Sequence, residues 1–456
     1  MVLINGISQD VKAEIALPGD KSISHRAIFI SAIARGKTHI SNFAFSRDCL
    51  RTIDVFRRLG TKIDIFRRSK EVVVWGRGLK GMRPPSARRL YLGESGTTIR
   101  LLAGILCGQG FPSLLTAAPS LSRRPMLRIT QPLRMFGACI AGRRSAGEEF
   151  PPLRISPGCL RGIDYTLPVA SAQVKSALLF AGLYAAGQTR IREKIVSRDH
   201  SERMLGLFGA DIRKMGREII LSPVPRLTSP GPIVVPGDIS SAAFFIVLAV
   251  LTIGSQIKIK LSLTNPTRCG IIRVLKRMGG KIKVVGDRGV DAGASGAGEP
   301  RGDIVAGFSP LRGIEVLAKD IPSFVDELPV FMVAASLARG KTIIRGVSEL
   351  RVKETDRVSS MVSNLTRMGA KIKVKRCAKG KKGDEYIEIV GVPRLRGTKV
   401  NSFGDHRTAM SMVVAGMAAA GRTDIDDISC IDKSFPGFMA MVNRVVGHRR
   451  RRVWKG

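Results

Sequence analysis

The sequence is poor in aromatic residues and has no long apolar run. Phe, Trp and Tyr make up 5% of the 456 residues, which is little for a protein that stacks the bases of single-stranded nucleic acid on aromatic rings. The longest apolar run, residues 242–253, covers about 12 residues, whereas a bilayer-spanning helix needs roughly 20. Residues 1–11 lack the basic and apolar regions of a signal peptide. We therefore expect no base-stacking surface, no membrane partner and no secretion.

Cysteine patterns that indicate disulfides or metals are also missing. The seven cysteines are an odd number and form no Cys-x-x-Cys pair, so the sequence predicts neither a disulfide framework nor a zinc ribbon. A reducing compartment, the cytoplasm, is the expectation that follows.

Positive charge, in contrast, is abundant. The chain has 75 Lys and Arg against 36 Asp and Glu, a formal net charge of +39. Such a charge fits either a polyanion such as nucleic acid or a small anionic substrate. The basic residues are spread along the chain, and only residues 448–456 form a true basic run, which we expect to be a solvated tail. With 44% hydrophobic residues, the remainder has enough apolar material to fold as a globular protein.

Internal repeats indicate the architecture. An apolar stretch that ends in Ala-x-Gly-x-Thr-x-Ile occurs at residues 34–40, 185–191, 338–344 and 419–425, with looser copies around Gly108 and Gly254. Six copies of about 76 residues account for the whole length of 456. The sequence therefore predicts six similar structural units in one chain.

A second marker alternates with the first. Five amphipathic stretches end in a glycine that is followed by a short alternating segment; the glycines are Gly60, Gly137, Gly209, Gly279 and Gly369. A glycine just past the last helical turn is typical of a left-handed cap, and the alternation indicates a half-buried strand. Each repeat is thus predicted to hold two helices and several strands, an α/β arrangement, and the sixth is predicted to stop at its last helix near Val446.

Two similar turns suggest where the repeats divide into domains. Pro-Gly-Asp occurs at residues 18–20 and again at 236–238, each time before an apolar helix. If both turns are hinge crossings, residues 21–235 form one three-repeat domain, residues 1–20 plus 237–447 form the other, and 448–456 are a tail. Ligand sites favour the cleft between such domains.

Several predicted helices begin with basic and small polar residues. Lys21 and Arg26 lie at the start of the helix after the first Pro-Gly-Asp turn, which Ser22 or Asp20 can cap. Residues 93–100 and 171–176 have a similar construction. The backbone N–H groups and dipole of a helix start favour an anion. A surface helix start with incidental charge is the simpler alternative for each segment alone.

The second half of the sequence combines carboxylates with cations. Residues 320–327 end in Asp326 and Glu327 before an apolar helix, and Lys353 and Arg357 are spaced to lie one helical turn apart on one face. A carboxylate among so many cations stays ionised and can act as a general base. An ordinary salt-bridged helix face is the alternative for any one of these segments.

Taken together, these segments resemble the 5-enolpyruvylshikimate-3-phosphate (EPSP) synthase family, second bacterial class, over almost the whole chain. The resemblance rests on residues 18–26, 93–100, 124–125, 171–175, 236–242, 326–327, 350–357, 405–410 and 433–436, in this order. It implies two domains of three βαβαββ repeats each, which close on their ligands. It also implies transfer of the enolpyruvyl group of phosphoenolpyruvate to the 5-hydroxyl of shikimate 3-phosphate, a step of the shikimate pathway to chorismate and aromatic amino acids, with no metal or organic cofactor.

The resemblance assigns roles residue by residue. Shikimate 3-phosphate would be held by Lys21, Ser22, Arg26, Ser171, Gln173, Arg198 (or its neighbour Ser197), Asp326 and Lys353. Phosphoenolpyruvate would be held by Lys21, Gly96, Arg124, Gln173, Arg357, Arg407 and Lys433. Asp326 would accept the hydroxyl proton, and Glu354 or Lys21 would protonate the methylene carbon.

One residue departs from the family pattern. Position 94 is Glu, where the family usually has Asn, and its carboxylate repels phosphoenolpyruvate unless Arg100 or Arg124 pairs with it. Gly96 is the usual residue; in this family an Ala there crowds the herbicide glyphosate. The sequence therefore predicts an enzyme that glyphosate inhibits, with Glu94 as a possible modifier.

Two alternatives come from other functions. A UDP-N-acetylglucosamine enolpyruvyl transferase has a similar fold and donor but normally carries a reactive Cys before its Arg-Pro, and residues 120–126 here contain none. A basic nucleic-acid-binding protein would explain the charge of +39. The resemblance favours an enzyme for small anionic substrates, which we expect to be a monomer without a specific nucleic-acid partner.

Overall fold

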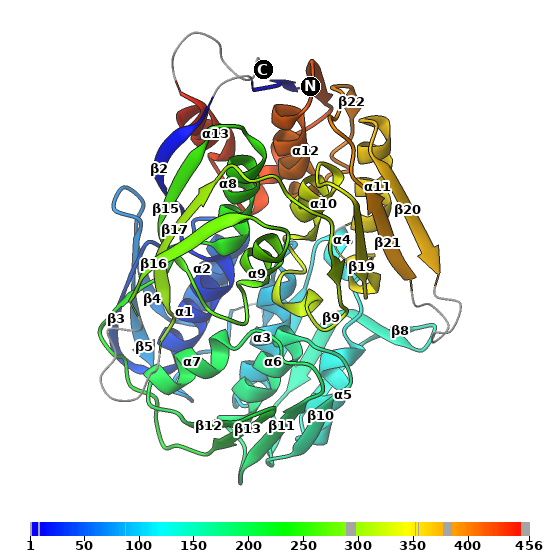
Figure 1. Cartoon of the computed structure of the whole chain (residues 1–456). Coiled ribbons are helices and arrows are strands. Elements are labelled where there is room, and N and C mark those ends of the chain that lie inside the picture. The colour runs from blue at the N-terminus through cyan, green and yellow to red at the C-terminus, as the bar shows by residue number, and fades with distance from the viewer. Residues whose placement is uncertain are drawn as a thin grey trace. The chain divides into compact units, whose positions relative to one another are not determined.

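The computed structural model describes residues 2–7, 10–86, 88–288, 298–351, 353, 355–376 and 385–447. This part of the chain forms six small sheets and thirteen α-helices (Figure 1). None of the described helices is long and apolar enough to cross a membrane. The α/β class and the six repeats predicted from the glycine pattern are confirmed.

Three of the sheets belong to the first half of the chain and share one strand order. The first contains β14 (Pro232–Val234), β3 (Arg35–Ser41), β5 (Glu71–Arg77) and β4 (Lys62–Phe66). The second contains β6 (Arg89–Tyr91), β7 (Ser113–Thr116), β9 (Glu148–Ser156) and β8 (Cys139–Ser145). The third contains β10 (Asp164–Leu167), β11 (Thr189–Glu193), β13 (Glu218–Ser222) and β12 (Asp211–Met215). In each, the first two strands are parallel and the other pairs are antiparallel.

The second half repeats the pattern. One sheet contains β2 (Lys12–Ala16), β15 (Gln256–Leu263), β17 (Arg301–Gly307) and β16 (Lys281–Arg288). The next contains β18 (Glu315–Val316), β19 (Lys341–Arg345), β21 (Glu385–Val390) and β20 (Lys371–Arg376). The last has three strands, β22 (Lys399–Val400), β23 (Arg422–Ile425) and the N-terminal β1 (Val2–Asn5).

Strands that precede the two Pro-Gly-Asp turns are exchanged between repeats. β2 pairs in parallel with β15 of the fourth repeat, and β14 pairs in parallel with β3 of the first. β1 pairs antiparallel with β23 and so completes the sixth sheet. The last described helix is α13 (Phe438–Val446), whose end agrees with the end predicted near Val446; residues 448–456, the predicted tail, lie outside the described residues. Dividing the sequence into six equal consecutive repeats would therefore place β1, β2 and β14 in the wrong sheets.

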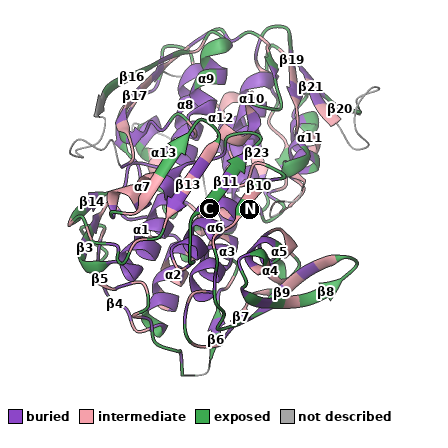
Figure 2. Cartoon of the chain, turned by 90° about the horizontal axis from the view of Figure 1, so that it is seen from below, coloured by how far each residue is buried: buried purple, intermediate pink, exposed green. Residues whose placement is uncertain are grey.

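The first helix of each repeat is buried on almost every residue, which explains why it is apolar all round. These helices are α1 (Lys21–Ile33), α3 (Gly96–Leu106), α6 (Ala172–Gly182), α8 (Ile239–Leu251), α10 (Leu328–Ser336) and α12 (His406–Ala418). Figure 2 shows α1 and α8 largely in the colour of buried residues.

The second helix of each of the first five repeats packs on its own sheet with one apolar face, whereas that of the sixth packs on β2, in the sheet of the fourth repeat. These helices are α2 (Arg47–Arg58), α5 (Leu127–Met135), α7 (His200–Leu207), α9 (Gly270–Arg277), α11 (Arg357–Arg367) and α13, with the short α4 (Pro119–Ser122) in addition. The five predicted cap glycines follow five of them in the left-handed region, with φ between 84° at Gly209 and 93° at Gly279. The predicted helix ends are confirmed at these positions.

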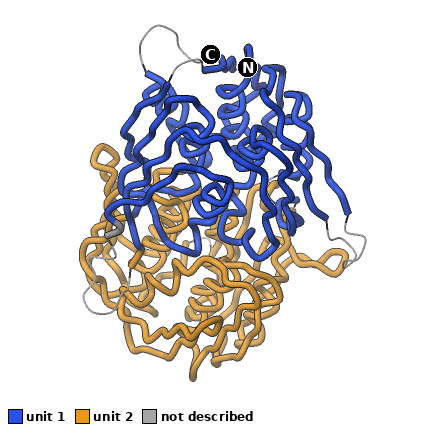
Figure 3. The backbone as a smooth tube through the Cα atoms, viewed as in Figure 1, with its two compact units in different colours: residues 1–18, 236–288, 300–456 blue, residues 19–235, 289–299 orange. Residues whose placement is uncertain are grey.

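The chain divides into two compact units (Figure 3). Unit 1 consists of residues 1–18, 236–288 and 300–456, and unit 2 of residues 19–235 and 289–299. Within unit 2, the ring of Phe29 lies 5.0 Å from that of Phe56 and 5.8 Å from that of Phe180. Within unit 1, the rings of Phe244 and Phe438 lie 5.7 Å apart. Each unit thus has a core of its own.

Candidate functional site

In unit 2, the starts of α1, α3 and α6 are each capped by a polar side chain. Asp20 accepts a hydrogen bond from the Ile23 N–H at 2.9 Å and so caps α1. Ser95 caps α3, and Ser171 caps α6. Each cap satisfies one backbone N–H, and the remaining first-turn N–H groups favour an anion.

Arg26 ties two of these helices together. Its guanidinium donates to Ser176 Oγ on α6 at 2.8 Å, to Ser201 Oγ on α7 at 2.7 Å and to the Ser22 carbonyl at 3.0 Å. The residue is 3% exposed, and burial lowers the pKa of Arg26 to about 10. Arg26 therefore remains a cation at neutral pH while it fixes α1 to α6 and α7.

A second group of polar side chains joins α3 to α6. Arg100 Nη1 donates to Gln173 Oε1 at 2.6 Å, and Gln173 Nε2 donates to Thr97 Oγ1 at 3.0 Å. A Cβ atom at Gly96 would lie 3.2 Å from Arg100 Nη1 and 3.3 Å from Arg124 Nη1. Two guanidinium groups therefore lie beside the first residue of α3, and only a residue without a side chain leaves them undisturbed.

Lys21 and Glu94 are partly accessible members of this region. The Lys21 ammonium pairs with Asp48, and both side chains are 22% exposed. Glu94 is exposed and accepts a hydrogen bond from Ser120 Oγ at 2.9 Å. Arg198 is half-buried on the segment between β11 and α7.

A buried chain of hydroxyl groups supports the starts of α1 and α3. His25 Nδ1 lies 2.7 Å from Thr52 Oγ1, which lies 2.8 Å from Thr98 Oγ1; that hydroxyl lies 2.6 Å from Ser95 Oγ. His25 is 0% exposed, and burial lowers the pKa of His25 to about 3. The imidazole is therefore neutral in the folded protein at physiological pH.

Acid should destabilise the fold through His25. Its pKa is about 6.5 when unfolded and about 3 when folded, so the unfolded state binds the extra proton between these values. The contribution of His25 to the free energy of unfolding is therefore largest above pH 6.5. Below that pH the free energy of unfolding falls by up to about 1.4 kcal/mol per pH unit until the pH reaches about 3. Urea unfolding at several pH values should show a shallower decline for His25→Gln than for the unaltered chain. The exposed His39→Gln serves as control, and equal slopes for His25→Gln and the unaltered chain would contradict the assignment.

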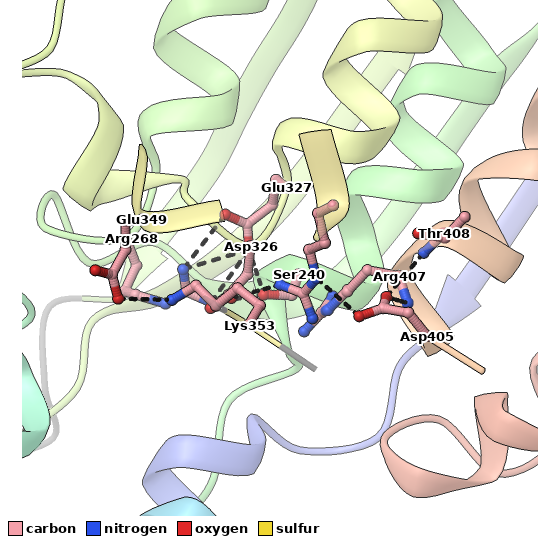
Figure 4. A network of polar contacts seen from close by, with 10 residues as sticks. Ser240, Arg268, Asp326, Glu327, Glu349, Lys353, Asp405, Arg407 and Thr408 are labelled. Atoms are coloured by element: carbon pink, nitrogen blue, oxygen red, sulfur yellow. Dashed lines mark hydrogen bonds and ion pairs between the residues drawn. The ribbon is translucent and has the colours of Figure 1, made fainter. Parts of the chain in front are cut away.

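Unit 1 holds a second group of charged side chains, drawn in Figure 4. Arg357, the first residue of α11, is 2% exposed; its Nε lies 3.0 Å from Asp405 Oδ2, and its Nη1 lies 3.4 Å from Asp326 Oδ1. Asp405 is completely buried, whereas the Asp326 side chain is 21% exposed. One arginine thus joins a buried carboxylate to a carboxylate that solvent reaches.

Asp405 also sets the start of α12. Its Oδ1 accepts from the N–H groups of Arg407 at 2.7 Å and Thr408 at 3.0 Å. This cap holds Arg407, which is 8% exposed, in the first turn of the helix. Figure 4 shows Asp405 beside Arg407 and Thr408 at this cap. Asp405 is therefore shared between the cap and the ion pair with Arg357.

A buried ion pair lies next to Asp326 in the sequence, and sequence reasoning missed its basic member. Arg268 Nη1 lies 3.3 Å from Glu327 Oε1, and Arg268 Nη2 donates to Ser240 Oγ at 2.7 Å; the Ser240 hydroxyl donates to Glu327. Arg268 and Glu327 are at most 2% exposed. The only sequence signal was a single arginine in a turn, residues 264–270, that precedes an amphipathic helix.

The prediction that Lys353 and Arg357 share one helix face is wrong. α11 begins at Arg357, because the carboxylate of Asp356 caps the helix by accepting from the Ser359 N–H at 3.0 Å. Lys353 lies in the preceding segment, where its Nζ is 3.3 Å from Glu349 Oε1 (Figure 4). Glu354 lies outside the described residues.

The other predicted site residues fall into two groups. Unit 2 holds Lys21, Ser22, Arg26, Gly96, Arg124, Ser171, Gln173, Ser197 and Arg198. Unit 1 holds Asp326, Lys353, Arg357, Arg407 and Lys433, the last at the end of the 3₁₀ helix η3 (Ser429–Lys433). Contacts join Asp326 to Arg357 and, through Asp405, to Arg407.

Known proteins are similar to this chain in sequence and in fold. The family model for EPSP synthase (3-phosphoshikimate 1-carboxyvinyltransferase) matches residues 6–442. The chain belongs to the EPSP synthase family. A relative from Geobacter sp. (strain M21), named 3-phosphoshikimate 1-carboxyvinyltransferase, is 46% identical over 96% of this chain and 98% of its own length. One from Desulforamulus reducens with the same name is 45% identical over 98% of this chain and 99% of its own.

Solved structures of this family have the same fold. EPSP synthase from Acinetobacter baumannii matches with a TM-score of 0.84 and 40% identity, covering 97% of this chain and 98% of that one. The predicted family and the predicted enolpyruvyl transferase fold are confirmed. As a member of the EPSP synthase family, the chain is a transferase.

Proposed function

We propose that this chain transfers the enolpyruvyl group of phosphoenolpyruvate to the 5-hydroxyl of shikimate 3-phosphate and releases phosphate, in the shikimate pathway to chorismate. The observation that carries this is membership of the EPSP synthase family along residues 6–442. The chemistry of the described residues supports this proposal, because both substrates are anions. Basic side chains lie in the first two turns of capped helices in both units: Lys21 and Arg26 on α1, Arg100 on α3 and Arg407 on α12.

In unit 2, the proposed ligands of shikimate 3-phosphate are Lys21, Ser22, Arg26, Ser171, Gln173 and Arg198. The first turns of α1 and α6 supply backbone N–H groups that favour such an anion. For phosphoenolpyruvate we propose Lys21, Gly96, Arg124 and Gln173. The bond from Arg100 to Gln173 holds this side chain in one orientation, which reduces the cost of ordering it on binding.

In unit 1, Asp326 is the proposed general base for the 5-hydroxyl, and Lys353 a second ligand of shikimate 3-phosphate. Asp326 suits a base because its side chain is 21% exposed, within reach of a ligand, while Arg357 holds one of its oxygens. Arg357, Arg407 and Lys433 are the proposed cations for phosphoenolpyruvate.

The proposed reaction has two steps. In the first, the 5-hydroxyl oxygen bonds to C2 of phosphoenolpyruvate, Asp326 takes the hydroxyl proton, and Lys21 or Glu354 gives a proton to C3. In the second, C3 gives its added proton back to the group that supplied it, the bond between C2 and the phosphate oxygen breaks, and phosphate leaves with the proton that Asp326 had taken. Cations around both substrates offset their mutual repulsion and the charge that develops on the phosphate.

An acceptor comparison tests the proposal. The purified chain is given phosphoenolpyruvate with either shikimate 3-phosphate or UDP-N-acetylglucosamine, and the enolpyruvyl product is measured by mass spectrometry. We expect product with shikimate 3-phosphate alone. Product with the nucleotide sugar alone would overturn the proposed acceptor, and binding of random duplex DNA without transfer to either acceptor would favour the nucleic-acid alternative.

Gly96→Ala should weaken phosphoenolpyruvate binding and glyphosate inhibition. The added methyl would lie within 3.3 Å of the terminal nitrogens of Arg100 and Arg124, so both guanidinium groups must shift. We expect glyphosate to inhibit the unaltered enzyme, and Gly96→Ala to raise both KM for phosphoenolpyruvate and the inhibitory glyphosate concentration, roughly tenfold or more. Gly110→Ala, where a Cβ meets nothing within 4 Å, is the matched control. Full activity of the unaltered enzyme at high glyphosate with normal phosphoenolpyruvate affinity would contradict the prediction.

We also propose that units 1 and 2 correspond to the two predicted three-repeat domains, residues 1–20 plus 237–447 and residues 21–235.

We further propose that the protein is a monomer in the cytoplasm. Among the described residues no cysteine forms a disulfide, which is typical of proteins in a reducing compartment.

A further inference from the structure

A fully buried lysine lies one helical turn beyond the start of α6. The Lys175 N–H donates to the Ser171 carbonyl at 3.0 Å, and the Lys175 side chain is 0% exposed. Its Nζ lies 2.9 Å from Glu193 Oε2 and 2.7 Å from Glu202 Oε1. Burial alone would lower the pKa of Lys175, but the carboxylates of Glu202 and Glu193 outweigh burial and raise it. The cluster is therefore one cation between two anions.

This cluster extends from α6 to the segment that carries Arg198. Glu193 ends β11, and its other oxygen, Oε1, accepts from both the N–H of Ser197 at 2.9 Å and the Ser197 hydroxyl at 2.5 Å. Ser197 is 4% exposed. Lys175 thus holds Glu193, and Glu193 holds the residue directly before Arg198.

The other side of Arg198 is anchored as well. Asp199 Oδ2 lies 3.1 Å from Arg203 Nε and 3.8 Å from Lys214 Nζ. Residues 194–196, by contrast, are exposed. Arg198 is therefore half-buried between two anchored neighbours, at the end of an otherwise exposed loop.

Glu202 links Lys175 to α7. It follows Ser201, which accepts from Arg26 at 2.7 Å and lies 2.6 Å from Ser176 on α6. Through these two carboxylates Lys175 contacts both β11 and α7. Its own helix, α6, begins after the cap Ser171 and carries Gln173, both proposed ligands of shikimate 3-phosphate.

We propose that Lys175 is a positioning residue for shikimate 3-phosphate: through Glu193 and Glu202 it fixes the start of α6 relative to the loop of Arg198, so that ligands on both elements reach one substrate phosphate. The proposal rests on the proposed function, since it assumes that substrate. Lys175 itself, being buried, does not touch the ligand.

Kinetics of Lys175→Met test this role. We expect KM for shikimate 3-phosphate, and its Kd measured by calorimetry, to rise about tenfold or more, while kcat falls less than about threefold. Because Lys175→Met leaves two carboxylates without their cation, a triple variant, Lys175→Met/Glu193→Gln/Glu202→Gln, removes all three charges of the cluster. Its thermal stability should approach that of the unaltered enzyme, while its KM for shikimate 3-phosphate stays raised.

The adjacent position on β11 offers a matched control. Arg192 likewise lies between two carboxylates, 2.5 Å from Asp164 and 2.9 Å from Glu218, but it is 45% exposed. Arg192→Met should leave KM and kcat unchanged. An unchanged Kd for shikimate 3-phosphate in the folded triple variant would overturn the positioning role. Failure of the proposed function would look different: the unaltered enzyme itself would then bind no shikimate 3-phosphate, and this inference would fail with it.

Discussion

Asp326→Asn should lower kcat by about 10²- to 10⁴-fold, the range typical of losing a general base. The amide keeps the shape of the carboxylate but cannot take the hydroxyl proton. Because the Asp326 side chain is 21% exposed and its contact with Arg357 is long, at 3.4 Å, the unfolding free energy should change by less than about 1 kcal/mol. Initial rates at saturating substrates and urea unfolding of the same preparation separate the two effects.

Asp320→Asn is the matched control for this experiment. Asp320 precedes η1 (Ile321–Ser323) in the same segment of unit 1, is 26% exposed and pairs with Arg277 at 3.2 Å. We expect full activity in the control. Full activity in Asp326→Asn, or an equal loss in both variants, would show that Asp326 is not the base.

Arg357→Met should damage stability and substrate binding together. Arg357 is 2% exposed and pairs with the fully buried Asp405 at 3.0 Å, so its loss leaves a buried carboxylate without that cation. Breaking such a pair typically costs about 3–5 kcal/mol of unfolding free energy. KM for phosphoenolpyruvate should rise at least tenfold, since a proposed ligand is removed and the start of α12 with Arg407 loses its support.

A double variant distinguishes these two effects. Asn remains a good helix cap, so Arg357→Met/Asp405→Asn should regain much of the lost stability while the raised KM for phosphoenolpyruvate persists. Arg277→Met is the control, because Arg277 also pairs with a carboxylate, Asp320, but is 45% exposed. This variant should lower the free energy of unfolding by less than about 1 kcal/mol. If Arg357→Met unfolds at the same urea concentration as the unaltered chain, the Asp405 pair contributes nothing and the argument for it fails.

Backbone features of this chain were predictable because they depend on local residue types. Gly60 and Gly369 end helices in the left-handed region, a conformation that other residues adopt at a cost, so a glycine after an amphipathic stretch correctly predicted the helix end. Asp20 caps α1 because a short carboxylate directly before the first helical residue reaches a first-turn N–H. These signals do not require knowledge of distant contacts.

Long-range pairing was not predictable in the same way. β2 and β14 pair with strands far away in the sequence. Neither the length nor the composition of these two strands predicts which strand each of them pairs with. Lys353 and Arg357 have helical spacing, but the Asp356 cap begins the helix after Lys353. Spacing predicts a shared face only where the helix actually extends over both positions.

Side-chain networks were the least predictable part of the site. Arg268 pairs with Glu327 across 59 positions, and Lys175 joins Glu193 and Glu202 inside unit 2. Sequence reasoning identified the residues that resemble family ligands, such as Arg26 and Gln173, but not the partners that orient them. Those partners are defined by the packing of helices against each other, which only the structure describes.

The central claim is most directly tested by phosphate release from phosphoenolpyruvate, measured with the purified, unaltered chain in the presence and absence of shikimate 3-phosphate. We predict release only when shikimate 3-phosphate is present, with one phosphate for each enolpyruvyl product formed. Release that is independent of shikimate 3-phosphate, or no release with both substrates present, would contradict the account.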